Sequence, residues 1–144
     1  MIKITTIITL FLISSLTLFS QSNQMISDYN RTLGKEGAHL IEYKLTLSQD
    51  GTFYFHSYSS NIQGIPPEVN KYGKGKWKAK KNIVSFFTDK ENDIDEKHTL
   101  DFNNSKARFI SKSPRDKTDK IVKTSLQFFE SKIFWIEKMK IFKK

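Results

Sequence analysis

Lysines occupy every second position of one short stretch of the chain, from Lys74 to Lys80 in KYGKGKWKAKK. Alternate side chains of an extended strand point to opposite sides, so these lysines share one face and the intervening Gly, Trp and Ala share the other. Such a row of ammonium groups could hold an anion, or it could simply keep an exposed strand face wet and unpaired. The anion-binding candidates in this stretch are Lys74, Lys76 and Lys78.

A second group of cations surrounds the loop SKSPRDKTDK, in which Arg115 and Lys117 are further anion-binding candidates. The 144-residue chain holds 24 Lys and Arg against 15 Asp and Glu, a net charge of +9. Net charge bears on association rather than on fold, so these cations favour an anionic partner. No RNP, KH or helix-turn-helix signature accompanies them. We therefore predict an anionic envelope polymer or a partner protein rather than an intracellular nucleic acid.

Metal and catalytic chemistry find little support in the residue spacing. The acidic segment TDKENDIDEK departs from the EF-hand template, because Ile94 replaces its glycine and Leu100 its final glutamate. His39, His56 and His98 fall on three different predicted strands without the spacing of a metal site. The chain has no cysteine, no G-x-S-x-G, no H-E-x-x-H and no phosphate-binding glycine loop. We predict a non-catalytic protein that uses no metal and no cofactor.

Aromatic side chains supply the remaining candidate site. Aromatic residues of a β-protein usually form its core, but an eight-stranded barrel whose interior is not full can hold one small ligand. The leading prediction is a binding protein for a small apolar or amphipathic ligand, and the alternative is a basic interaction module. The ligand-binding candidates are Phe53, Phe55, Trp77, Phe102, Phe109 and Trp135.

Period-2 alternation after residue 38 indicates the strands that must position these side chains. A three-residue loop, Gln49 to Gly51, would set Leu47 opposite Phe53, with Gly51 left-handed in a bulge. We predict an all-β domain, an antiparallel meander of about eight strands that forms a barrel or a flattened sandwich. Later strands are predicted at 73–79, 83–87, 98–102, 107–110, 121–128 and 134–142.

The first residues read as a secretory signal peptide, residues 1–20. Lys3 precedes the apolar run Ile4 to Phe19, and Ser20 suits the position before a cleavage site. The run is shorter than the roughly 20 apolar residues that span a bilayer, so we predict no membrane span after cleavage and a periplasmic or extracellular location. Residues 21–38 form a leader that could be a short helix, an ordered arm or a floppy segment, and residues 39–144 form the β-domain.

The run LTLSQDGTFYFHSY, followed by YGKGKWKAKKNIVSFFT, resembles small secreted bacterial proteins of lipocalin-like type, most of them uncharacterised. In these proteins a D-G-T-F hairpin precedes a G-x-W strand, here Gly75-Lys76-Trp77. The resemblance extends over residues 39–144, including the C-terminal SLQFFESKIFWIEKMKIFKK. It implies a lipocalin-like barrel that holds a ligand within its sheet. In lipocalins themselves G-x-W lies on the first strand, whereas here it falls in the middle of the chain.

Overall fold

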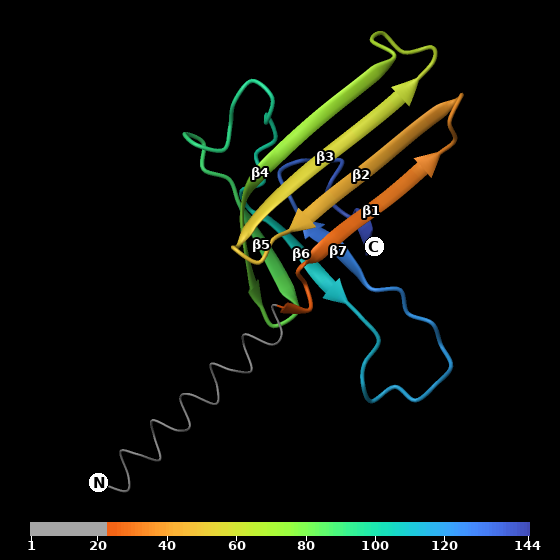
Figure 1. Cartoon of the computed structure of the whole chain (residues 1–144), viewed down its shortest axis with the longest axis vertical. Helices are drawn as coiled ribbons and strands as arrows, with labels where there is room; N and C mark the ends of the chain where they lie inside the picture. Colours follow the sequence, from red (N-terminus) through yellow and green to blue (C-terminus); the bar gives the residue numbers. More distant parts are fainter. Residues whose placement is uncertain (1–22) are drawn as a thin grey trace, which may run out of the picture.

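The computed structural model describes residues 23–144 as a single closed β-barrel (Figure 1). Each strand pairs antiparallel with the next along the chain, and β1 pairs with β8 to close the barrel. The predicted all-β meander is confirmed, and it forms a barrel rather than a flattened sandwich. The strands are β1 (Ser27–Gly34), β2 (His39–Leu47), β3 (Thr52–Asn61), β4 (Glu68–Lys80), β5 (Ile83–Phe87), β6 (Ser105–Ile110), β7 (Ser125–Glu130) and β8 (Lys140–Lys143).

The β2–β3 hairpin has the predicted register. Leu47 lies opposite Phe53, and Leu45 lies opposite Phe55. Gly51 adopts a φ of 84°, the left-handed conformation that glycine reaches without steric cost. Apolar matching across the pair therefore fixed the register, because a slip of one residue would turn every side chain to the other face.

The leader turns out to hold the first strand of the barrel. Ser27–Gly34 pairs along its whole length with β2, and Tyr29 and Asn30 pair with β8. The β-domain therefore begins before residue 39, and of the three alternatives only an ordered segment fits, as a strand rather than a helix. The predicted signal peptide lies outside the described residues. Within residues 23–144, no helix is long and apolar enough to cross a membrane.

The prediction of a strand at residues 98–102 is wrong, because this segment is not part of the sheet. This segment belongs to the long β5–β6 loop and makes only one isolated parallel bridge, between Tyr72 and His98. The reason is that a strand has two edges, and those of β6 are already taken by β5 and β7. Phe102 is nevertheless fully buried, because the loop carries its ring into the barrel.

The last two strands are shorter than predicted. β7 begins at Ser125 rather than 121, and β8 begins at Lys140 rather than 134. Residues 131–139 instead form turns, in which the amide of Ile136 donates to the carbonyl of Ile133 at 3.0 Å. These turns bury Ile136 completely, so the apolar pattern that suggested a strand reflects burial within a turn.

Glycine positions in the lysine stretch make room for the aromatic core. A Cβ on Gly73 would lie 2.6 Å from the Phe102 ring, and a Cβ on Gly75 would collide with the Phe87 carbonyl. Both glycines face inward, on the side of β4 opposite the lysines. The lysine stretch thus has a basic outer face and an inner face whose glycines leave space for aromatic rings from other parts of the chain.

Candidate functional site

Three of the predicted ligand-binding residues form the packed core. Phe53, Phe55 and Phe102 are at most 1 % exposed, and their ring centroids lie 5.1 to 5.2 Å apart in the Phe53–Phe102 and Phe55–Phe102 pairs. Trp77 is also buried, and its indole N–H donates to the carbonyl of Ser48 at 3.0 Å. These four aromatic residues fill the interior of the barrel and stabilise it. Of the predicted set, Trp135 and Phe109 remain, and each lines a hollow in the surface.

The predicted anion-binding residues lie on two separate elements. Lys74 is half-buried and pairs with Asp95 at 3.5 Å, whereas Lys76 and Lys78 are exposed on the outer face of β4. Arg115 and Lys117 lie in the loop between β6 and β7, and β5 separates that strand pair from β4. The five cations therefore do not form one site.

The strongest candidate site lies where β1 to β4 run past the packed core, which we call the mouth. Here four inward-facing residues stand directly opposite one another in successive strands. At about 4.8 Å between neighbouring strands, the two ends of this row are roughly 14 Å apart. We call it the cation row, because a cation stands at each end. Its members are Arg31, Tyr43, Ser57 and Lys71.

Trp135, from the β7–β8 loop, forms the floor of the mouth. Its ring stacks on Tyr43 with centroids 5.9 Å apart and packs at 6.1 Å from Phe55, so it covers the top of the core. The ammonium of Lys71 stands 5.5 Å above the indole centroid. The hollow above this floor has a volume of about 260 Å³, and the residues that line it are Tyr43, Ser57, Ser59, Val69, Lys71 and Trp135.

Three apolar residues and one serine follow the cation row on its solvent side, and we call them the apolar rim. Leu33, Ile41, Ser59 and Val69 stand opposite one another in β1 to β4, two residues beyond the cation row in each strand. Leu33 is 39 % exposed and Val69 is 37 % exposed, which is unusual for inward-facing apolar residues of a barrel. The mouth thus places charged groups between a buried aromatic floor and an exposed apolar rim.

The charges of the cation row have no carboxylate partner among residues 23–144. Neither Arg31 nor Lys71 takes part in an ion pair there. The guanidinium of Arg31 is half-buried and donates to the carbonyl of Lys140 at 3.0 Å, which fixes its position. Burial raises the pKa of the Tyr43 hydroxyl, and the charge of Arg31 offsets part of that rise. Tyr43 therefore stays protonated at neutral pH and offers a hydroxyl donor between two positive charges.

Sequence reasoning missed both cations of the row. Arg31 lay in the leader, whose structure the sequence left open. Lys71 did carry a signal, because it shares the parity of Gly73, Gly75 and Trp77, which face inward, rather than that of the lysines from Lys74 onward. An odd lysine on the inner face of a strand is the feature that could have indicated the site.

Two of the three histidines, His56 and His98, lie with the acidic loop on the outer surface, whereas His39 lies apart at the start of β2. His56 stacks on Tyr72 with centroids 4.4 Å apart, and the imidazole of His98 lies 3.0 Å from the carboxylate of Asp95. Hydrogen bonds from the backbone and then the side chain of His98 hold the pKa of Asp95 well below its usual range. No group of three or more metal-ligating side chains occurs within the part of the chain that the structure describes. The acidic loop is thus held by hydrogen bonds to its own neighbours.

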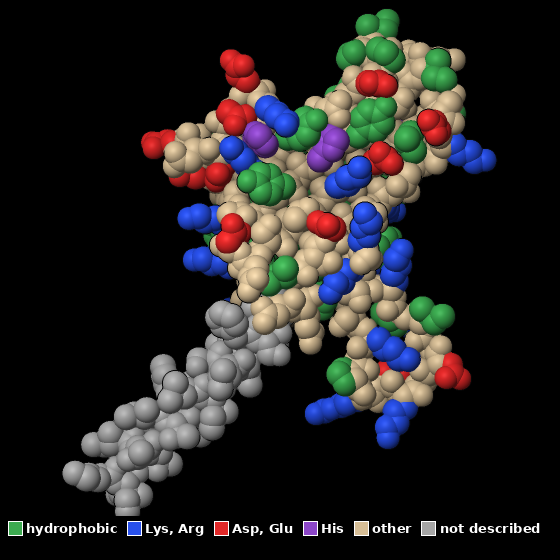
Figure 2. Space-filling model, in the orientation of Figure 1, with side chains coloured by type: hydrophobic (Ala, Val, Ile, Leu, Met, Phe, Trp, Pro, Cys, Tyr) green, Lys and Arg blue, Asp and Glu red, His purple; other side chains and the backbone are tan. Residues whose placement is uncertain are grey.

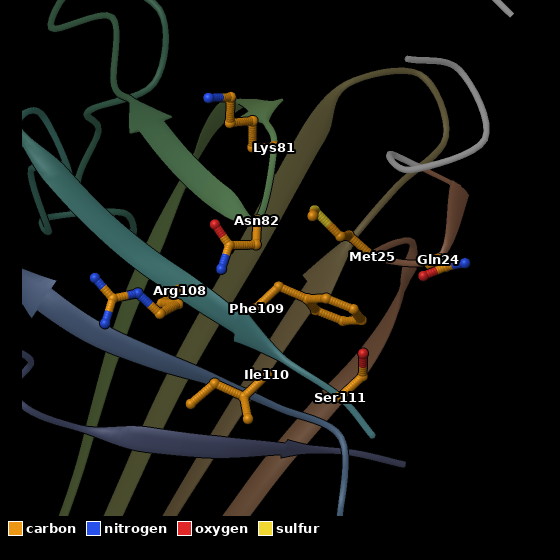
Figure 3. Close-up of a pocket in the computed structure, with 8 residues that line it drawn as sticks. All are labelled: Gln24, Met25, Lys81, Asn82, Arg108, Phe109, Ile110 and Ser111. Atoms are coloured by element: carbon orange, nitrogen blue, oxygen red, sulfur yellow. The ribbon is translucent and has the colours of Figure 1, made fainter. Parts of the chain in front are cut away.

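The opposite end of the barrel holds a second hollow, of about 720 Å³, which Figure 3 shows. Met25 and Phe109 form its apolar floor, and both are less than 10 % exposed. Lys81 and Arg108 carry positive charge at its edge. We call this part of the molecule, together with the β6–β7 loop 111–124, the basic end.

Fold and site together define an eight-stranded up-and-down barrel with an aromatic core, a cationic mouth and a basic end. Comparison of the chain with protein-family models, with curated proteins and with solved structures finds no match.

Proposed function

We propose that the protein is a non-catalytic binding protein for a small amphipathic anion, which it holds at the mouth of the barrel. The observation that carries this proposal is the inward-facing Lys71, which stands in one row with Arg31 and has no carboxylate partner in the described chain. Lys71 places its charge over the Trp135 ring on the inner face, at a position where an apolar side chain would be expected. Solubility does not require a lysine at this inward-facing position, whereas the binding of an anionic ligand would use its charge.

The arrangement of the mouth suggests how such a ligand lies. Its anionic group sits near Lys71 and the hydroxyls of Tyr43 and Ser57, with Arg31 at the far end of the row. Its apolar or aromatic body rests on Trp135 and extends toward the rim at Leu33 and Val69. The hollow of about 260 Å³ is just below the range of roughly 300 to 1,000 Å³ typical of small-molecule pockets. It therefore suits a head group or a ring, with the rest of the ligand along the rim.

The packed interior moves this site outward from the one that the sequence predicted. The ring of Phe102 packs against both Phe53 and Phe55, so we place the ligand above Trp135 rather than among them. The lipocalin-like relationship and the periplasmic or extracellular location belong to the same proposal, and both are supported by the residues of the chain alone. A barrel that binds an amphipathic anion is compatible with a periplasmic or an extracellular location.

Titration with 8-anilinonaphthalene-1-sulfonate, an aromatic sulfonate that fluoresces when bound, tests the mouth. Lys71→Gln should raise its Kd at least about tenfold, because a hydrogen bond to a charged group contributes roughly 1.5 to 3 kcal/mol. Lys78→Gln is the matched control: Lys78 is also exposed on β4 and stands 5.8 Å from an aromatic ring, Phe87, but it faces outward. Equal affinity of Lys71→Gln and the wild type would refute the proposal.

Competition experiments distinguish the contribution of the ligand's charge to binding from that of its apolar chain. Octanoate should displace the bound sulfonate far better than octanol, because both carry the same chain and only octanoate carries charge. Equal displacement by the two would show that the cation row is not used. Native mass spectrometry of freshly purified protein should then identify any amphipathic anion that copurifies with the wild type and is absent from Lys71→Gln.

A further inference from the structure

The β6–β7 loop is the most basic connection of the barrel. Residues 111–124 contain five Lys and Arg and two Asp, and all five cations are exposed. Ile121 lies in the same loop with 92 % of its surface exposed. An isoleucine side chain that is almost fully exposed among positive charges gains no stabilisation from burial. The cations of the loop are Lys112, Arg115, Lys117, Lys120 and Lys123.

Hydrogen bonds within the loop engage one of its two acids. The carboxylate of Asp116 accepts from the amide of Thr118 at 2.9 Å and from its hydroxyl at 2.6 Å. The ammonium of Lys112 donates to the carbonyl of Thr118 at 2.6 Å, which braces the same turn. The loop is thereby folded so that Asp116 is tied to its own backbone while Arg115, Lys117 and Lys120 remain at the surface.

The loop lies at the end of the barrel where the described chain begins. Gln24 and Met25 line one hollow together with Arg108 and Ser111, the residue that opens the loop (Figures 1 and 3). In the sequence, the apolar run Ile4 to Phe19 ends just before this point. Residues 20–22 can bridge at most about 14 Å even when extended. Before the predicted signal peptide is cleaved, a membrane that holds the apolar run would therefore be close to the basic end.

We infer that the basic end docks on an anionic lipid surface. The exposed cations of the loop lie against the head groups, and Ile121 enters the interface between them. Anionic lipids attract basic segments over about one Debye length, and an apolar side chain adds affinity only where there is acyl chain to receive it. Ile121 thus favours a lipid surface over a soluble anionic polymer, which would use the cations alone. The inference is independent of ligand binding at the mouth.

Vesicle flotation tests the inference with the chain from Ser22 onward, because residues 23–144 contain all eight strands and the core. Vesicles of phosphatidylcholine mixed with phosphatidylglycerol should bind the protein, and vesicles of phosphatidylcholine alone should not. The triple variant Arg115→Gln, Lys117→Gln, Lys120→Gln should bind on the order of 100-fold more weakly, at about fivefold per cation.

A second triple variant changes the net charge equally at other connections. Its three exposed lysines lie in the β1–β2, β5–β6 and β7–β8 connections, at the mouth side of the barrel. It should bind anionic vesicles within about fivefold of the wild type. Equal losses in the two triples would overturn the inference, because binding would then follow total charge. The control substitutions are Lys35→Gln, Lys90→Gln and Lys132→Gln.

Ile121→Ser distinguishes a membrane from a soluble polymer. It should weaken vesicle binding several-fold and leave binding to heparin unchanged, because only a lipid surface receives the side chain. If the wild type binds heparin and fails to bind the anionic vesicles, the partner is a polymer and the inference is wrong. Unchanged vesicle binding by Ile121→Ser would also contradict it. The sulfonate titration at the mouth should be the same in the variants of loop 111–124 as in the wild type.

Discussion

Both ends of the barrel carry cations, but the cations face in different directions. At the mouth, Arg31 and Lys71 stand on the inner faces of long strands, above an aromatic floor. At the basic end, Arg108 and the cations of loop 111–124 are exposed on the outside of the molecule. Figure 2 shows Lys and Arg side chains gathered on the protruding loop. The mouth therefore suits one small anion held between side chains, whereas the basic end suits an extended anionic surface.

Strand length produces this difference. β1 to β4 have 8 to 13 residues, whereas β5 to β8 have 4 to 6. The long strands overhang the packed core on one side, so inward positions there are uncovered and can hold polar groups. In the packed half below them, most buried positions are apolar or glycine, and the buried Ser105 and Ser125 are exceptions. The two halves should thus respond differently to substitution.

The largest effect is expected for Trp77→Ala, in the packed half of β4. The change removes a buried ring and its hydrogen bond to the Ser48 carbonyl, and should lower the free energy of unfolding by about 3 to 5 kcal/mol. Urea denaturation followed by circular dichroism measures it. The control is the triple Lys74→Gln, Lys76→Gln, Lys78→Gln on the outer face, which should cost less than about 0.5 kcal/mol per site. A variant Trp77→Ala as stable as the wild type would contradict the assignment of this half to packing.

Losses of stability of intermediate size are expected for substitutions of two glycines on β4. Gly75→Ala places a methyl group against the backbone carbonyl of Phe87 in the β4–β5 pair, and should cost about 1 to 3 kcal/mol. Gly73→Ala, nearer the mouth, meets the side chain of Phe102, which a loop carries, rather than the backbone of a paired strand. Thermal melts of both variants should rank Gly75→Ala as the less stable. The reverse order would show that the loop is as rigid as the sheet.

Trp135→Ala should leave the barrel folded and impair the mouth. The indole stacks on Tyr43, and loss of such an aromatic pair costs about 0.5 to 1.5 kcal/mol beyond its buried area. Binding of 8-anilinonaphthalene-1-sulfonate should be lost, since the floor of the hollow is gone. Trp135→Phe, which keeps a ring, is expected to retain most of the binding. Full binding by Trp135→Ala would place the ligand elsewhere.

The smallest effect concerns the pH dependence of the loop beside the mouth. Because hydrogen bonds from His98 lower the pKa of Asp95 in the folded state, its carboxylate adds stability above the ordinary Asp pKa of about 3.9. That contribution is lost as the pH falls further, through the folded-state pKa. Asp95→Asn should therefore melt slightly lower than the wild type near neutral pH, and the difference should vanish in acid. A constant difference across this range would assign the effect to packing.

Much of the fold could be predicted from local patterns. The β2–β3 hairpin followed from alternation and from Gly51, because side-chain parity and turn geometry are properties of neighbouring residues. The burial of Trp77 opposite the lysines followed from the same parity. The strand at 98–102 was predicted wrongly, because local alternation does not reveal that both edges of β6 are taken.

The sequence by itself determined which residues of each strand face inward and which turn outward, since that depends only on the period of an extended chain. Only the tertiary structure decided what those inward positions meet. It brought Arg31, Tyr43, Ser57 and Lys71 into one row and drove Phe102 into the space left by Gly73. The physical reason is that, outside a tight hairpin, the register between strands and the closure of the barrel depend on residues far apart in the chain and on the packing of the whole core.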